Sequence, residues 1–447
     1  MKNLKKKRRT LILIALGIEL SVAVLLGNSI LGGNIMNSNT LVAIIIMLLM
    51  VPILLVALLL AVLNKKNTPN TAPVYVTSDS KEKSPEPPSE RFCMLKRIEE
   101  KKNGYGHNRY DNKITLYEIC ERFRNYAASK LGLYYDIDDI RRFVAGMAVS
   151  HIVILQGMSG TGKTSMAHAF GSFVDNSSTV IPVQPMWKER TDLIGYYNEF
   201  TKRFNETLLL EKMYEANYSG DIYVTVLDEM NIARVEYYFA EFLSLLELPN
   251  PEERYLDVVS DKWDNDPSQL KDGRIKLPAN MWFIGTANND DSTFAISDKV
   301  YDRAMILNLD SKTERFAAPG TGKVKLSAAH FCSLAAEAEK EFKVSERNMA
   351  RLEALDKYLI EHFHITFGNR IMKQILSYIP IFISCGGDEL VALDDILAKK
   401  VFRKLETQNP IYLRNSVQGL LSFIDDLFGK NSMPLCREYI LKIQRNA

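Results

Sequence analysis

Apolar residues are spread unevenly along the chain, and two long runs near the N-terminus differ from everything that follows. Residues 11–31 are apolar apart from Glu19 and a few small or polar residues, and residues 41–63 contain no charge. Each run is long enough to cross the roughly 30 Å hydrocarbon core of a bilayer. Basic residues flank only the outer ends of the pair, so the positive-inside rule places both ends in the cytoplasm. The pattern predicts two transmembrane helices within residues 1–63 and a multi-pass membrane protein whose termini and remaining chain are cytoplasmic.

A cleaved signal peptide is the alternative interpretation, because a basic segment precedes the first apolar run. That run is longer than the core of a signal peptide, no A-x-A site follows it, and a second span comes at once. These features favour the hairpin. Residues 64–90 then contain many Pro, Ser and Thr residues and almost no apolar ones, which is typical of a disordered tether.

Beyond the tether, short β-branched apolar runs alternate with helically spaced segments. The runs at 151–156, 221–228 and 281–286 have the length and composition of buried strands. Strands that alternate with helices predict an α/β fold, with a parallel sheet and helices on both faces. We place this domain, with a helical lead-in, at residues 91–315, and a C-terminal helical lid at residues 316–447.

A phosphate-binding motif follows the first of these runs. Residues 157–164 read GMSGTGKT and match G-x-x-x-x-G-K-[ST], with strand before and helix after. The N–H groups of such a loop wrap the phosphates, its lysine reaches the β- and γ-phosphates, and its threonine hydroxyl binds Mg²⁺. The predicted nucleotide-binding residues are therefore Gly157, Ser159, Gly160, Thr161, Gly162, Lys163, Thr164 and Ser165.

An acidic pair ends the second run, DIYVTVLDE, at Asp228 and Glu229. This is the Walker B pattern, in which Asp228 holds Mg²⁺ together with Thr164, and Glu229 orients or deprotonates the attacking water. A surface turn is the alternative reading of an acidic pair at the end of a strand. The distance along the chain from the P-loop favours the catalytic interpretation.

Four segments together resemble the McrB-like and dynein-related branch of AAA+ ATPases, which is related to the MoxR proteins. They lie within residues 135–405 and read ILQGMSGTGKTS, VQPMWKERTDLIGYYNEF, VLDEMNIARVEYYFAEFLSLLE and FIGTANNDDSTFAISDKVYDRA. The resemblance implies a homo-oligomeric ring, expected to be a hexamer, with Mg²⁺ and nucleotide at the subunit interfaces.

The same resemblance implies catalytic roles for three further residues. Asn288 would contact the γ-phosphate or the attacking water. Arg303 would stabilise charge on the neighbouring subunit's nucleotide, with an ion pair to Asp298 or Asp302 as its alternative. Arg370, within FGNRIMKQILSYI, would reach back from the lid to the γ-phosphate, with an ordinary helix-surface arginine as its alternative.

The sequence defines less narrowly which nucleotide base is bound and which segments contact a partner. Asn288 and Asp291 match an N-x-x-D element that the McrB branch associates with GTP, whereas related DE-[MI]-N sequences resemble ATPases, so we favour ATP and leave GTP open. Tyr196 and Tyr197 would either grip a translocating chain or pack in the core. Residues 251–278 predict an inserted β-hairpin.

Charge and cysteine content narrow the partner classes. The formal net charge is +2, and the basic excess lies beside the two N-terminal apolar runs, so the rest of the chain is mildly acidic. A general attraction to nucleic acid is therefore not implied. The five cysteines are scattered and odd in number, which indicates free thiols rather than a disulfide framework or a zinc site.

The leading hypothesis is a membrane-anchored, ATP-hydrolysing ring that remodels a protein partner. Because McrB-branch proteins often belong to restriction and anti-phage systems, the resemblance also suggests a defence role. One alternative is an NTP-driven, DNA-translocating subunit of a restriction-like complex. The other is a nucleotide-gated membrane scaffold or pore.

Overall fold

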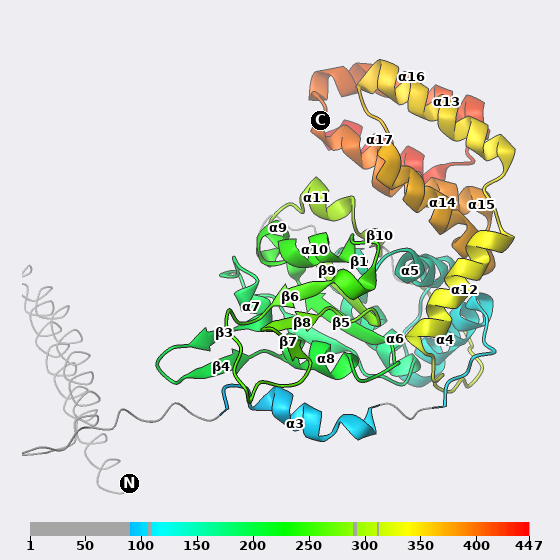
Figure 1. The fold of residues 1–447 in the computed structure, drawn as a ribbon. Helices are drawn as coiled ribbons and strands as arrows, with labels where there is room; N and C mark the ends of the chain where they lie inside the picture. Colours follow the sequence, from blue (N-terminus) through cyan, green and yellow to red (C-terminus); the bar gives the residue numbers. More distant parts are fainter. Residues whose placement is uncertain (1–89, 106–108, 289–292, 311–312, 447) are drawn as a thin grey trace, which may run out of the picture. The chain divides into compact units, whose positions relative to one another are not determined.

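The computed structural model describes residues 90–105, 109–288, 293–310 and 313–446 (Figure 1). These residues belong to one compact unit, residues 85–447. Within it, a central parallel sheet carries helices on both faces, and a group of helices follows at the C-terminal end. The predicted α/β class is therefore confirmed for the described part of the chain.

The central sheet has five strands in the order β10-β1-β9-β5-β2, and all its neighbouring pairs are parallel. The P-loop follows β1, and the Walker B pair ends β5. Because β9 lies between these two strands, their carboxyl ends are separated by one strand only. The bounds are β1 (Ile152–Gly157), β2 (Thr179–Pro182), β5 (Tyr223–Asp228), β9 (Met281–Asn288) and β10 (Met305–Asn308).

Side chains alternate between the two faces of the sheet. In β1, Val153 and Leu155 join one buried cluster, whereas Ile152 and Ile154 join the other. This is the period of two expected of a strand, and burial on both sides explains the continuous apolar runs. The first face packs against α4 (Leu116–Leu131), α5 (Ile137–Val149), α6 (Lys163–Phe173) and α12 (Ala328–Glu341). The second packs against α7 (Thr191–Ile194), α8 (Leu208–Ala216), α9 (Val235–Tyr238), α10 (Ala240–Leu246) and α11 (Asp298–Tyr301).

Local signals fix where helices begin and end. Before α4, the Thr115 hydroxyl accepts a hydrogen bond from the Glu118 N–H while the Glu118 carboxylate accepts one from the Thr115 N–H, which is a capping box. The same helix ends at Gly132 in the left-handed conformation (φ 66°).

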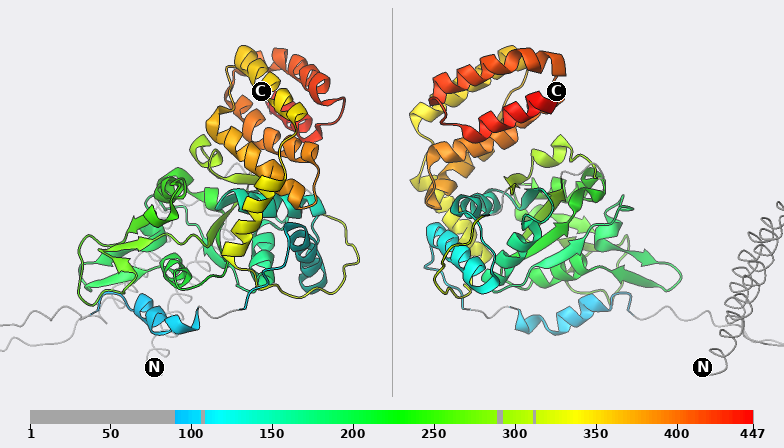
Figure 2. Two further views of the ribbon diagram at one scale, coloured as in Figure 1. Left: turned by 45° about the vertical axis from the view of Figure 1, so that its right-hand side comes forward. Right: turned by 180° about the vertical axis from the view of Figure 1, so that it is seen from behind.

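Two antiparallel elements are inserted around the second face of the sheet. One is a hairpin of β3 (Gly195–Asn198) and β4 (Arg203–Glu206). The other is a small sheet of β6 (Tyr255–Asp257), β7 (Leu270–Lys271) and β8 (Arg274–Lys276), within the segment where a hairpin was predicted. The helix α3 (Met94–Glu100) runs beside their bases (Figures 1 and 2).

The C-terminal helices gather at one end of the described unit (Figure 2). They share a continuous buried cluster with α4, α5 and α6, so this lid is packed onto the α/β core. Their bounds are α13 (Glu346–Phe363), α14 (Gly368–Ser384), α15 (Glu389–Ile396), the π-helical turn η4 (Leu397–Val401), the 3-10 segment η5 (Phe402–Thr407), α16 (Pro410–Phe428) and α17 (Pro434–Asn446).

The predicted membrane localisation is corrected. The two predicted spans, 11–31 and 41–63, and the tether up to residue 89 lie outside the described residues. Among the helices that are described, every one is too short or too polar to cross a bilayer. The multi-pass localisation thus has no supporting span and is not retained.

Candidate active site

The loop between β1 and α6 has a shape that only glycine permits at its start. Gly157 has a φ of 143°, and a Cβ there would lie 2.3 Å from the carbonyl oxygen of Leu309. Gly162, with a φ of 92°, precedes the first residue of α6, and its carbonyl accepts a 3.1 Å hydrogen bond from the Tyr135 hydroxyl. A loop of this kind brings backbone N–H groups and a helix N-terminus close to a phosphate.

Lys163 lies against the backbone of its own loop. The residue is 7% exposed, and its Nζ donates to the carbonyl oxygens of Gly157 (2.9 Å) and Met158 (2.7 Å). The Thr161 hydroxyl also donates to Met158 (3.0 Å). An ammonium held by neutral carbonyls can exchange them for the stronger, charge-assisted contacts of a phosphate. Of the other predicted loop residues, Ser159 and Gly160 are exposed and Ser165 is half-buried in α6.

The two residues predicted to hold Mg²⁺ are in contact. The Thr164 hydroxyl donates to Oδ1 of Asp228 at 2.7 Å, because the first turn of α6 and the end of β5 meet at the carboxyl edge of the sheet. A hydroxyl beside a carboxylate is part of the oxygen ligand set that Mg²⁺ uses with phosphates and water. The residues present therefore fit this metal.

Thr286 is a functional candidate that the sequence analysis missed. Its hydroxyl donates to Oδ1 of Asp228 (2.8 Å) and accepts a hydrogen bond from the N–H of Glu229 (2.8 Å). Glu229 has a left-handed backbone (φ 52°), a costly conformation for this residue type that occurs often at active sites. The one available signal was a threonine two residues before Asn288 in an otherwise apolar run.

Asn288 ends β9 directly opposite Gly157 of β1. Its carbonyl accepts hydrogen bonds from the Asn231 side chain (2.9 Å) and the Thr293 hydroxyl (3.1 Å). The residue also lines a cavity of about 690 Å³. The structure thus brings Asn288 to the loop and the acidic pair, whereas Asp291 lies outside the described residues.

Arg303 lies at the opposite edge of the sheet. It comes just before β10, whose residues pair with β1 from Val153 to Gln156, so it is level with the amino end of β1. A strand advances about 3.3 Å per residue, which separates Arg303 from Gly157 by roughly 20 Å. Its guanidinium pairs with Glu247 at 2.8 Å, and not with either of the aspartates suggested as alternatives.

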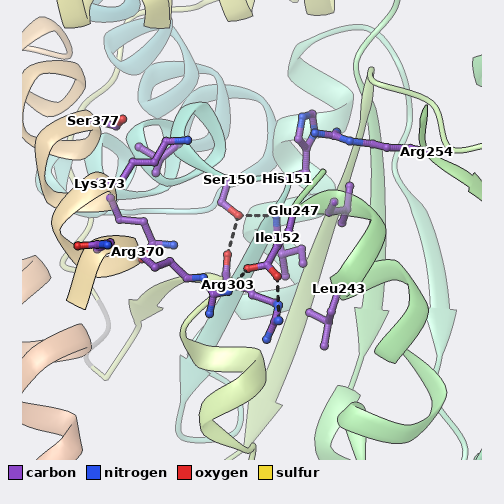
Figure 3. Close-up of a pocket in the computed structure, with 14 residues that line it drawn as sticks. Ser150, His151, Ile152, Leu243, Glu247, Arg254, Arg303, Arg370, Lys373 and Ser377 are labelled. Atoms are coloured by element: carbon purple, nitrogen blue, oxygen red, sulfur yellow. Dashed lines mark hydrogen bonds and ion pairs between the residues drawn. The ribbon is translucent and has the colours of Figure 1, made fainter. Parts of the chain in front are cut away.

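Arg370 differs from its prediction. It pairs with the same Glu247 at 2.6 Å, so it lies beside Arg303 and not at the P-loop of its own chain (Figure 3). The physical reason is the placement of α14, where Gln374 donates to the carbonyl of Asp302 (3.0 Å). This contact fixes the N-terminal half of α14 at the amino edge of the sheet.

The two arginines face a cavity of about 480 Å³ whose charge is mainly positive. Arg254 and Lys373 line it as well, and Glu247 is the one acidic residue in its lining (Figure 3). Burial lowers the pKa of His151 to about 4, so this neighbouring imidazole is neutral at pH 7. Arginine stays charged at any ordinary pH, and the cavity therefore suits an anion.

The β3–β4 hairpin separates the two tyrosines of the predicted gripping pair. Tyr196 is 53% exposed, whereas Tyr197 packs against Trp263 with ring centroids 6.1 Å apart. Among the aromatic side chains of the described residues, Phe200 at the turn is the most exposed, at 99%. The Asn198 side chain holds that turn by accepting the N–H of Phe200 at 3.0 Å.

The fold and this geometry define a P-loop nucleotide site in an AAA+ type domain. Residues 152–304 match the family model described as "AAA domain (dynein-related subfamily)", which supports an AAA-type domain in this part of the chain. Residues 323–447 match "Domain of unknown function (DUF8727)". The narrower McrB-like assignment has no support from these matches.

Two further comparisons add little. A solved structure described as "a putative ATPase from Cytophaga hutchinsonii ATCC 33406" is 14% identical, with a TM-score of 0.45, and the match covers 74% of this chain and 97% of that chain. No curated protein matches the chain.

Proposed function

We propose that this protein is an oligomeric ATPase whose nucleotide sites are completed by neighbouring subunits, and that it remodels a protein partner. One observation carries the proposal. Arg303 and Arg370 meet at Glu247, at the edge of the sheet opposite the P-loop of the same chain. Arginines so placed serve a nucleotide best when a second subunit brings its P-loop edge against them.

Head-to-tail contacts of this kind generate closed rings. One edge of each subunit supplies Lys163, Thr164 and Asp228, and the other supplies the two arginines. Six subunits is the number that the resemblance suggests. Glu247 would release the arginines when a γ-phosphate enters, because an anion of higher charge competes for the same guanidinium groups.

Within one subunit, each side chain at the carboxyl edge has a distinct task. Lys163 would bind the β- and γ-phosphate oxygens. Bound Mg²⁺ would neutralise phosphate charge, held by Thr164 and Asp228. Glu229 would orient and deprotonate the attacking water, and Asn288 would position that water or the γ-phosphate.

The protein partner is proposed from the inserted elements. The β3–β4 hairpin presents Phe200 fully to solvent at its turn, where an aromatic side chain is available to contact a polypeptide. The anti-phage setting rests on the resemblance alone and has no separate observation behind it.

The test is phosphate release by the full chain with ATP and with GTP, measured across protein concentration, with Lys163→Ala as the inactive control. A shared site predicts a rate per subunit that rises with concentration as rings form. We expect ATP to be preferred. A concentration-independent rate that survives Arg303→Ala would contradict the shared site, and a preference for GTP would correct the base.

A further inference from the structure

The lid binds the short segment that carries Arg303. Lys400, in the π-helical turn η4, is 4% exposed. Its Nζ donates to the carbonyl oxygen of Tyr301 (2.6 Å) and to that of Ala304. These two carbonyls flank Arg303 on both sides in the sequence, so the amine fixes the backbone from which the Arg303 side chain leaves.

A second lid residue, Arg403, contacts the same segment. The Arg403 guanidinium pairs with the Asp298 carboxylate, donates to the carbonyl of Ile296 (3.3 Å) and lies 3.4 Å over the ring of Tyr301. Side chains of η4 and η5 thus hold α11 and the turn that leads from it to β10.

Burying the amine of Lys400 costs more free energy than a purely structural role would require. Its two acceptors are neutral carbonyls, and burial lowers the pKa of its amine to about 7. Desolvating an ammonium without a directly paired carboxylate is unfavourable, and an apolar side chain of similar length would fill the space at less cost. Single π-helical turns occur frequently at functional sites.

Both acidic and basic side chains lie near the Lys400 amine. Asp302 favours the protonated amine, whereas nearby positive charges oppose it; the latter are Arg370, Arg403 and Lys404. Arg370 is the partner of Arg303 at Glu247. The buried amine therefore belongs to the same charge cluster as the two arginines.

We propose that Lys400 is a positioning residue that, through the lid, aims Arg303 at the nucleotide of the neighbouring subunit. The inference rests on the proposed shared site. Lys400 touches no nucleotide itself; it acts by holding the α11–β10 turn. Its loss should therefore lower the turnover number of the neighbour while the KM for nucleotide stays unchanged, since the P-loop of every subunit is intact.

The experiment mixes two inactive or weakened full-length variants. Lys400→Met subunits keep a working P-loop, and Lys163→Ala subunits keep Lys400 and Arg303. Lys400→Met alone should lose about 10- to 100-fold in turnover, the scale of a small misplacement of a catalytic group. Mixing it with Lys163→Ala should restore activity, because Lys163→Ala subunits present a correctly held Arg303 to intact P-loops.

Controls separate positioning from folding. Lys399→Met removes the neighbouring buried lysine, which pairs with Asp395 inside the lid, and should leave turnover per assembled subunit unchanged. Lys400→Gln keeps two N–H donors on a neutral group and replaces Lys400→Met if the apolar variant does not assemble. The same rescue is expected for it.

Three results would overturn the inference. If Arg303→Ala is rescued by Lys163→Ala but the Lys400 variants are not, Lys400 acts within its own subunit or only on folding, and the shared site still stands. Wild-type turnover in Lys400→Met would mean that Lys400 does not position Arg303 at all, and the shared site would again still stand. If Arg303→Ala is not rescued either, the shared site itself is wrong and the inference falls with it.

Discussion

Thr286 joins the two acidic residues that end β5. Its hydroxyl is 2.8 Å from the Asp228 carboxylate and 2.8 Å from the backbone nitrogen of Glu229. The Thr286 and Thr164 hydroxyls both donate to the same oxygen, Oδ1 of Asp228. The contact with the backbone nitrogen holds Glu229 in its left-handed conformation. One buried hydroxyl therefore contacts both the proposed metal ligand and the proposed base, and helps to set their positions.

Thr286→Val should lower turnover by about 10- to 100-fold, because the valine has nearly the same shape but cannot hold either group in place. Steady-state phosphate release, with Mg²⁺ varied, measures the effect. Thr225→Val is the matched control, since Thr225 is equally buried on β5. Equal losses in both variants would show that the effect is one of strand packing.

The buried amine of Lys400 makes the free energy of unfolding depend on pH, and the direction of its pKa shift gives the sign of that dependence. Its pKa is about 7 in the folded chain and about 10.4 when unfolded. Between these values the unfolded state binds more protons, so this residue makes the free energy of unfolding rise with pH, and the gain is lost as the pH falls through about 7. The groups that face the amine are Asp302, Arg370, Arg403 and Lys404.

Urea unfolding of the wild type and of Lys400→Met at pH 6, 7.5 and 9 checks this expectation, the values being chosen to lie on either side of about 7 and below about 10.4. The stability advantage of Lys400→Met should be largest at the lowest pH and shrink toward the highest. A difference between the two proteins that does not change with pH would contradict it.

At the scale of elements, α3 ties the two inserted β elements together. The Glu206 carboxylate, at the end of β4, accepts hydrogen bonds from the N–H groups of Cys93, Met94 and Leu95 at the start of α3. Just before it, Arg91 is 2% exposed and reaches the segment between β6 and β7. This junction couples the hairpin and the small sheet to the segment that follows residue 89.

The contact between Arg91 and the segment between β6 and β7 should depend on Asp266 more than on Asp261. Asp266 pairs with Arg91 at 2.6 Å and has a side chain 5% exposed, whereas Asp261 pairs at 3.2 Å and is 64% exposed. Asp266→Asn leaves a buried charge poorly compensated and should cost about 3 kcal/mol. Asp261→Asn should cost less than about 1 kcal/mol.

Hydrogen exchange of the β3–β4 amides reports this junction directly. Asp266→Asn should accelerate exchange there, and Asp261→Asn should change it little. Equal effects would mean that Arg91 is not anchored by its buried partner.

Phe200 gives the hairpin a predicted task. Because the side chain is 99% exposed, Phe200→Ala should leave stability and basal ATP hydrolysis unchanged. It should reduce the stimulation of hydrolysis by a permanently unfolded polypeptide. Ile411→Ala, an exposed apolar position on α16 (71%), is the control. Stimulation that survives in Phe200→Ala would remove the hairpin from the proposed partner contact.

The sequence predicted those parts of the site that depend on local order. The glycine-rich loop, Lys163 and Thr164 are contiguous in the sequence, and Asp228 ends a strand that its apolar run makes easy to recognise. Because parallel strands bring their carboxyl ends to the same edge of a sheet, these residues were expected to meet there. Arg370 was misplaced because the direction of α14 depends on tertiary contacts such as Gln374 with the backbone of Asp302. Thr286 and Phe200 were missed because an isolated polar residue in a strand, or an aromatic one in a turn, has no periodic pattern.

At the scale of the whole described unit, the two edges of the sheet are chemically complementary. One carries the phosphate loop and the acidic pair; the other carries Arg303 and Arg370 around a single glutamate. In the proposed ring, neither edge would form the complete hydrolytic site by itself. A second subunit in a head-to-tail arrangement would supply the residues of the other edge.

The most direct test of this shared site mixes Lys163→Ala with Arg303→Ala, each inactive alone, and measures ATP hydrolysis as the ratio varies. Random assembly places an intact P-loop beside an intact arginine at up to about a quarter of the interfaces of a 1:1 mixture. The account predicts recovery toward that fraction, and the same recovery with Arg370→Ala in place of Arg303→Ala. Activity that stays at the sum of the two separate variants at every ratio would contradict it, since each subunit would then hold its whole site within one chain.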